Sequence, residues 1–201
     1  MAENSIHLQS GFLDLIFMEG VEELIGHSGL NAVTDQILSL GNAIKNEPWP
    51  SKSGLLMEAL ENIYGQRGGC GVALRAGRAS YKYLLRQFGG PLGLTSLDYR
   101  LQPAPQRLRN GLMLLAGLVG QAGNQKVNLE EADGAWFWRV EHCELCGHRT
   151  ASEVVCTFFT GLLQEFLSWA SGGKFYAVHE IECYACGAKG CVFRIDQKPL
   201  D

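Results

Sequence analysis

The chain has 201 residues, 46% of them hydrophobic, and a formal net charge of −4. This length and apolar content are enough for one hydrophobic core, while the acidic balance and the lack of a recognised binding motif argue against a nucleic-acid-binding protein. The sequence holds no run of 18 apolar residues and starts without a basic, apolar leader, so we expect a soluble, cytoplasmic protein without a transmembrane segment.

Two N-terminal stretches, 11–26 and 29–44, carry apolar side chains at helical spacing. The turn-rich stretch 46–54, which contains two prolines, predicts a linker. We therefore expect an N-terminal helical extension over residues 1–48, suited to dimerisation, and a separate domain over residues 54–198.

The middle of the chain predicts helices over 55–64, 70–88 and 103–120. Gly65 is expected to end the first, and small residues along the second, such as Gly77, allow close contact with another helix. The second helix also carries a basic stripe at intervals of three, four and four residues, formed by Arg75, Arg78, Lys82 and Arg86. Such a stripe predicts either a solvated face or a cationic wall for the acid groups of a ligand or a partner.

Charge is distributed unevenly along the chain. Residues 1–66 hold nine acids and two lysines, whereas residues 67–109 hold eight basic side chains and a single acid, Asp98. This separation predicts attraction between the first third and the middle, within one chain or across a dimer.

The last third predicts strands that enclose one helix. Alternation over 135–142 places Trp136 and Trp138 on the same side of a strand, after a shorter strand at 126–129. A helix is expected over about 152–170 with Ser152 as its N-cap, followed by strands over 174–183 and 191–196. The predicted fold class is α+β, with helices packed on a twisted antiparallel sheet.

Thiols and one carboxylate form the chemically richest group in the sequence. Four candidate metal ligands lie in the C-terminal part, namely Cys156, Glu180, Cys183 and Cys191. Thiolate sulfur and carboxylate oxygen both bind zinc, and a tetrahedral site needs four such groups. Other sets of four stay open, because Cys143 with Cys146 and Cys183 with Cys186 form CxxC pairs, and buried inert thiols are a further alternative. An odd total of seven cysteines without an export signal favours metal or free thiols over disulfides.

Two segments, VVCTFFTGLL and HEIECYACGAKGCVFRI, resemble the C-terminal signature of the 4-vinyl reductase (4VR) domain family. That family includes standalone proteins of bacteriochlorophyll and chlorophyll pathways and sensor domains of regulators that detect phenol and related aromatics. Its fold is similar to that of the transport-particle subunits of vesicle tethering.

The resemblance implies a zinc ion held by a cysteine at the start of a helix and by a glutamate and two cysteines after it. The matching residues are Cys156, Glu180, Cys183 and Cys191. Cys143 and Cys146 fall outside this set and are expected to be free thiols or a second, labile metal pair. A structural zinc is favoured over a catalytic one, because strand alternation places His179 and Glu182 away from the face of Glu180.

The resemblance also implies a hydrophobic small-molecule ligand, most readily a tetrapyrrole such as a chlorophyll precursor or a bilin. Its expected contacts are Trp136, Trp138 and Tyr81 for the ring, and Arg75, Arg78, Lys82 and Arg86 for its acid groups. Binding or delivery of that ligand in pigment biosynthesis or photosystem assembly is the first functional hypothesis. The others are a component of 8-vinyl reduction of a chlorophyll precursor and a dimeric scaffold or assembly factor without a ligand.

The hypothesis of a binding protein is favoured over that of an enzyme, because the sequence has no dinucleotide, flavin or iron–sulfur cluster motif. The expected partners are a second copy of the chain, in a homodimer, and pigment–protein assembly factors. The expected location is the cytoplasm, including the periphery of photosynthetic membranes.

Overall fold

The computed structural model describes residues 11–43, 52–123 and 125–200. Its helices are α1 (Phe12–Ala43), α2 (Lys52–Phe88), α3 (Leu97–Arg100), α4 (Ala104–Ala122) and α5 (Thr157–Ser171). Its strands are β1 (Lys126–Ala132), β2 (Ala135–Glu141), β3 (Tyr176–Glu182) and β4 (Gly190–Pro199), with a 3₁₀ turn at Tyr184–Cys186. The predicted α+β class is confirmed.

The four strands form one antiparallel sheet in the order β1, β2, β4, β3. Trp138 of β2 pairs with Phe193 of β4, and Val140 pairs with Cys191. Burial alternates along β2, so Trp136, Trp138 and Val140 all face the interior, as the sequence pattern predicts.

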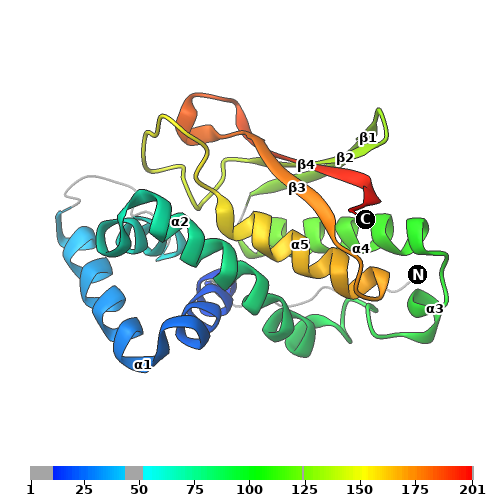
Figure 1. Cartoon of the computed structure of the whole chain (residues 1–201), viewed down its shortest axis with the longest axis horizontal. Coiled ribbons are helices and arrows are strands. Elements are labelled where there is room, and N and C mark those ends of the chain that lie inside the picture. Colours follow the sequence, from blue (N-terminus) through cyan, green and yellow to red (C-terminus); the bar gives the residue numbers. More distant parts are fainter. Residues whose placement is uncertain (1–10, 44–51, 124, 201) are drawn as a thin grey trace.

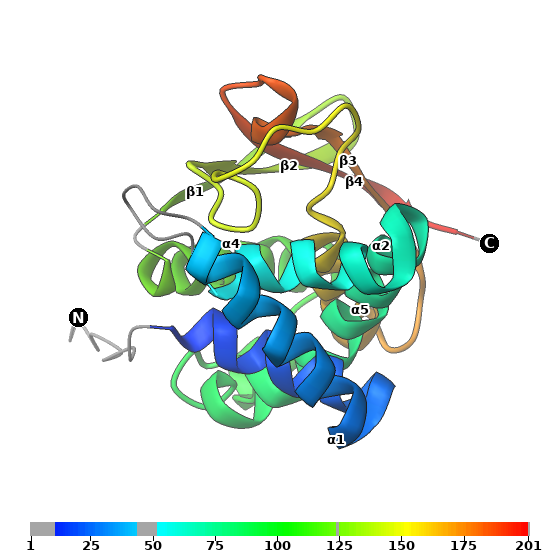
Figure 2. The same cartoon turned by 90° about the vertical axis from the view of Figure 1, so that its left-hand side faces the viewer.

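Helices cover one face of this sheet (Figure 1). Contacts join α4 to β1 and α5 to β3, while α2 packs on α5 and α1 packs on α2 (Figure 2). Adjacent residues of α5 face opposite ways, because the ring of Phe158 lies 4.0 Å from that of Phe17 in α1 and the ring of Phe159 lies 5.4 Å from that of Trp138. Helix α5 therefore lies between the sheet and the first two helices.

Glycine interrupts both long helices where the sequence predicts a break. Gly26 in α1 has φ 69° and Gly65 in α2 has φ 75°, so each range consists of two helical segments joined at a kink. The segments match the two predicted N-terminal helices and the predicted end of the helix at Gly65. Two further glycines, Gly77 of α2 and Gly161 of α5, lie where those helices cross.

Helix α1 contributes to the same hydrophobic core as the rest of the described chain, through Phe12, Ile16, Phe17 and other buried side chains. It also bears out the predicted charge attraction within one chain, since the Glu23 carboxylate lies 2.5 Å from the Lys82 ammonium of α2. The domain boundary after residue 48 stays a prediction, and most of the predicted linker lies outside the described residues. No helix in the described ranges is long and apolar enough to cross a bilayer.

Candidate metal centre and ligand cavity

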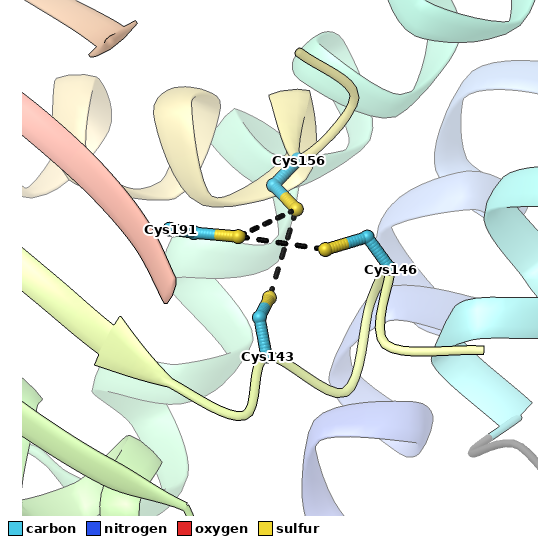
Figure 3. A group of neighbouring side chains, drawn as sticks. All are labelled: Cys143, Cys146, Cys156 and Cys191. Carbon is cyan, nitrogen blue, oxygen red and sulfur yellow. Dashed lines mark hydrogen bonds between the residues drawn. The ribbon is translucent and has the colours of Figure 1, made fainter. Parts of the chain in front are cut away.

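Five buried thiols meet at one end of the sheet. Cys143 and Cys146 lie in the loop after β2, Cys156 precedes α5, Cys183 follows β3, and Cys191 lies in β4. None of the five residues is more than 1% exposed, and all are free of disulfide bonds. Figure 3 shows four of them pointing toward a common centre. Such a concentration of buried thiols in separate elements is typical of a metal centre.

Distances between the sulfur atoms fit one metal ion. Cys156 Sγ lies 3.6 Å from Cys143 Sγ and 3.6 Å from Cys191 Sγ, and Cys146 Sγ lies 3.4 Å from Cys191 Sγ. Cys183 Sγ lies 3.8 Å from Cys146 Sγ and 3.9 Å from Cys191 Sγ. Zinc–sulfur bonds of about 2.3 Å in a tetrahedron place sulfur atoms roughly 3.8 Å apart. The donors are thus spaced as a tetrahedral metal requires, and the cluster could hold an ion.

Two sets of four donors each have all their ligand atoms within 4.8 Å of one another. The hairpin set is the one that the family resemblance implies, Cys156, Glu180, Cys183 and Cys191. The loop set consists of Cys143, Cys146, Cys156 and Cys191. The structure thus brings the predicted ligands together, and it adds the two cysteines that the sequence interpretation places outside. Cys186, by contrast, is exposed and belongs to neither set.

Glu180 presents a free carboxylate oxygen to this cluster. Its Oε2 accepts a hydrogen bond of 2.8 Å from the backbone N–H of Cys156, whereas its buried Oε1 has no partner among the described residues. Burial, reinforced by the neighbouring Cys183, raises the pKa of Glu180 to about 9. A buried carboxylate with one unused oxygen beside thiols is suited to binding a cation. His179 and Glu182 are exposed, in keeping with the predicted alternation.

The start of α5 differs from the prediction. The helix begins at Thr157 with Cys156 as its N-cap residue, so the prediction of Ser152 as N-cap is wrong. The chain before Cys156 is instead an irregular loop, pinned by a 2.9 Å hydrogen bond from Ala151 N to Ala185 O. At its other end, Gly147 N donates to Cys143 O at 2.8 Å and folds the CxxC segment into a turn. These contacts, rather than a helix cap, bring three thiols of this loop to one point.

The predicted aromatic wall is fully packed. Trp136 and Trp138 are 3% and 1% exposed, and Trp138 contacts the rings of Phe159 and Phe193. Yet neither indole N–H has a hydrogen-bond partner in the part of the chain that the structure describes. The buried hydroxyl of Tyr81 is also unpartnered there, and burial raises the pKa of this tyrosine. Each unsatisfied group of this kind costs about 1–3 kcal/mol.

The basic stripe on α2 lies on the other side of α5 from β2. Arg78 forms an ion pair of 3.1 Å with Glu165 of α5, and Lys82 pairs with Glu23 of α1. Arg75 and Arg86 are exposed. The structure therefore uses half of the stripe to hold helices together, and it does not bring the stripe beside the two tryptophans.

A cavity of about 490 Å³ opens where α2, α3, α4 and α5 meet. Its walls are formed by Leu85, Thr95, Tyr99, Arg100, Arg107, Trp169, Ala170 and Gly172. The rings of Tyr99 and Trp169 stack at 6.3 Å with an interplanar angle of 14°. Arg107 is fixed by hydrogen bonds to three carbonyl oxygens, those of Arg100, Gln102 and Ala170. An aromatic wall beside guanidinium groups, expected at the tryptophan strand, is found here instead.

Sequence reasoning missed this cavity for a physical reason. Trp169 and Arg107 belong to different helices, and no local pattern shows that the end of α5 meets the start of α4. The short helix α3, which supplies Tyr99 and Arg100, was not predicted either. A Ser96 N-cap followed by an apolar residue is its local signal, since the Ser96 hydroxyl accepts from Tyr99 N at 3.2 Å.

Comparisons with known proteins agree with this architecture. The structure is similar to an H-NOX protein from K. algicida (TM-score 0.56, 13% identity, 93% of this chain and 96% of that one). It is also similar to an H-NOX protein from S. oneidensis (TM-score 0.55, 12% identity, 96% and 100%) and to an H-NOX protein from work on heme distortion (TM-score 0.57, 15% identity, 96% and 97%). At such identities the likeness shows the fold alone.

The sequence itself matches one family. No curated protein matches it, but residues 136–197 match the model of the 4-vinyl reductase (4VR) domain. This segment spans β2, the cysteine loop, α5, β3 and nearly all of β4. The predicted resemblance is confirmed, and residues 136–197 are a 4-vinyl reductase domain segment.

Proposed function

We propose that this protein is a binding module for a hydrophobic, acid-bearing small molecule of the tetrapyrrole class, stabilised by a structural zinc ion. The observation that carries the proposal is the cavity of about 490 Å³ with Tyr99 and Trp169 on one wall and two arginines on another. Its size falls in the usual range for ligand sites, and no carboxylate lines it. A flat ring stacks on the aromatic wall while its carboxylates meet Arg100 and Arg107.

The tetrapyrrole class is favoured by the similar structures and narrowed by the histidines. Work on two of the similar H-NOX proteins concerns heme and porphyrin distortion, and their fold spans nearly the whole of this chain. The chain itself has no histidine near the cavity in the described ranges, since His27, His142 and His179 are exposed and His148 lies in the cysteine loop. The ligand is therefore held by stacking and ion pairs rather than by an axial histidine, as suits a bilin or a chlorophyll precursor.

The unpartnered indoles on β2 offer a second contact region. An acceptor group inserted between β2 and α5 would satisfy the N–H groups of Trp136 and Trp138, which lack partners in the described part of the chain. Substitution distinguishes the regions, because Trp169 lines the cavity and Trp138 does not.

The structural zinc is assigned to Cys156, Glu180, Cys183 and Cys191, the set that the family resemblance implies. Its role is to join α5 to the β3–β4 hairpin, since one ligand precedes the helix and three belong to the hairpin. Four protein donors leave no open position, so the ion is not assigned a catalytic task.

Titration with a dicarboxylate tetrapyrrole, protoporphyrin IX or biliverdin, tests the proposed function. Binding is read from the ligand's absorbance and from quenching of tryptophan fluorescence. Arg100→Ala should weaken binding a few-fold and Trp169→Leu about tenfold, whereas Arg75→Ala, which removes the same charge outside the cavity, should have no effect. Failure of either ligand to bind below about 100 µM with the fold intact would favour the scaffold hypothesis instead.

The wider role is proposed from the resemblance. Binding or delivery in pigment biosynthesis or photosystem assembly would involve a homodimer, and α1 offers an exposed apolar residue for such contact in Leu38, which is 60% exposed. Sedimentation of the wild-type chain beside Leu38→Glu tests this interface. A monomer at all concentrations would contradict the dimer.

A further inference from the structure

The thiol cluster offers more donors than one zinc ion accepts. Five sulfur atoms and the Glu180 carboxylate surround the same point, whereas structural zinc takes four ligands. The hairpin set and the loop set share Cys156 and Cys191, whose sulfur atoms lie 3.6 Å apart. Each set completes this shared pair with two donors of its own.

The geometry favours one ion over two. If two tetrahedral ions shared the Cys156–Cys191 edge, sulfurs bound to different ions would lie more than about 5 Å apart. Cys146 and Cys183, which belong to different sets, lie only 3.8 Å apart, a spacing typical of ligands on the same ion. The two sets are therefore alternatives for one ion.

We propose that Cys143 and Cys146 form a second ligand pair that competes with Glu180 and Cys183 for the same metal ion. The site thus has two coordination states, one with three thiolates and a carboxylate and one with four thiolates. This inference deepens the proposed function, because it rests on the structural zinc site. Passage between the states replaces one metal–ligand bond by another, and the proton that the entering thiol loses is taken up by the leaving donor, so no oxidant or reductant is needed.

The CxxC loop is positioned for such exchange by contacts with α2. Arg149 forms two hydrogen bonds with Glu61, at 2.6 and 3.0 Å, and His148 Nε2 lies 3.3 Å from a Glu58 oxygen. These ion pairs hold the loop near the metal whichever state is present. In the four-thiolate state the ion also ties the loop, and through it α2, to the hairpin; in the other state the ion ties only α5 and the hairpin.

The two states differ in their preference for metal ions. Thiolates favour softer ions, while a carboxylate suits harder ones. Cadmium should therefore favour the loop set more strongly than zinc or cobalt does. The loop then gives this chain a sensitivity to the kind of metal present that a single ligand set would lack.

Loading of the full chain with Co²⁺ and Zn²⁺ tests the proposal, because sulfur-to-cobalt charge-transfer absorbance grows with the number of thiolates. The loop variant, Cys143→Ser with Cys146→Ser, and the hairpin variant, Glu180→Gln with Cys183→Ser, should each keep one ion per chain. The hairpin variant should show the stronger absorbance of four thiolates, and the loop variant the weaker absorbance of three. Cys191→Ser, which removes a shared ligand, should lower zinc affinity about a hundredfold more than either, and Cys186→Ser is the matched control with an unchanged spectrum.

X-ray absorption of the wild-type chain provides a measurement that does not depend on the variants folding. We expect the mean number of sulfur ligands to lie between three and four with zinc and to rise with cadmium. The proposal is overturned if the loop variant behaves as wild type while the hairpin variant loses the ion, or the reverse, because one set then acts alone. A wild-type chain that binds no metal would instead refute the zinc site itself.

Discussion

Arg149, in the loop between β2 and α5, forms a bidentate ion pair with Glu61 of α2 at 2.6 and 3.0 Å. Both side chains are largely buried, at 13% and 16% exposed. The pair links the loop that carries two of the clustered thiols to a helix far away in sequence. A buried pair of this kind is strongly destabilised by the loss of one partner, because the other charge stays buried without compensation.

Substitution of Glu61 by Gln should therefore lower the free energy of unfolding by about 3 kcal/mol. Urea denaturation followed by circular dichroism measures the change. The exposed pair of Arg78 and Glu165 is the matched control, and Glu165→Gln should cost at most about 1 kcal/mol. Equal losses for the two variants would show that the burial of Glu61 has no energetic consequence.

Gly77→Ala should destabilise the protein by more than about 2 kcal/mol. A methyl group on Gly77 would overlap the backbone carbonyl oxygen of Phe158, so α2 and α5 would have to move apart. Gly71 provides the control, because it lies in the same helix with open space around it, and Gly71→Ala should stabilise by about 0.5–1 kcal/mol. Thermal melts of the two variants should shift in opposite directions, and a shared direction would contradict the close helix crossing.

Tyr81→Phe should raise the stability of the ligand-free protein by up to about 1 kcal/mol, because the buried hydroxyl has no hydrogen-bond partner in the described structure. Tyr99→Phe should lower it by about 1 kcal/mol, because the Tyr99 hydroxyl donates to the Arg107 carbonyl oxygen at 2.9 Å. Chemical denaturation of both variants gives the comparison. A loss at Tyr81 as large as at Tyr99 would indicate a partner for that hydroxyl.

Removal of metal should lower the melting temperature, and added zinc should restore it in proportion to the logarithm of its concentration. Differential scanning calorimetry with and without a chelator measures this shift. Cys191→Ser should remove most of the response, whereas Cys70→Ser should keep it, since Cys70 lies apart from the cluster beside Glu61. A melting temperature that ignores zinc would show that the thiols are only packed together.

Local signals in the sequence were sufficient for part of this fold. The alternation around Trp138 and the break at Gly65 follow from backbone geometry that a few neighbouring residues determine. Ser152 shows the limit, since a good capping residue is overridden when the chain must reach the cluster at Cys156 in an irregular loop. The spacing of Cys143 and Cys146 gave no indication that they approach Cys191, because that proximity depends on how the loop folds over the sheet.

The cavity was beyond the sequence for the same reason. Arg107 and Trp169 come together only because α4 and α5 pack side by side under the sheet. The basic stripe was easy to recognise, but its partners are set by tertiary packing, as the pair of Lys82 with Glu23 shows. Periodicity identifies the face that a side chain occupies and leaves its neighbour undetermined.

The shared pair of sulfur atoms also has a topological consequence. An ion bound to both Cys156 and Cys191 closes a ring of 36 residues that contains α5, β3 and the turn before β4. Closure of a ring of that size restricts the unfolded chain by about 4 kcal/mol, on the chain-entropy account of disulfide cross-links. In a reducing compartment, where a disulfide would not persist, a metal bridge gives the same restraint and can still be opened by removal of the ion.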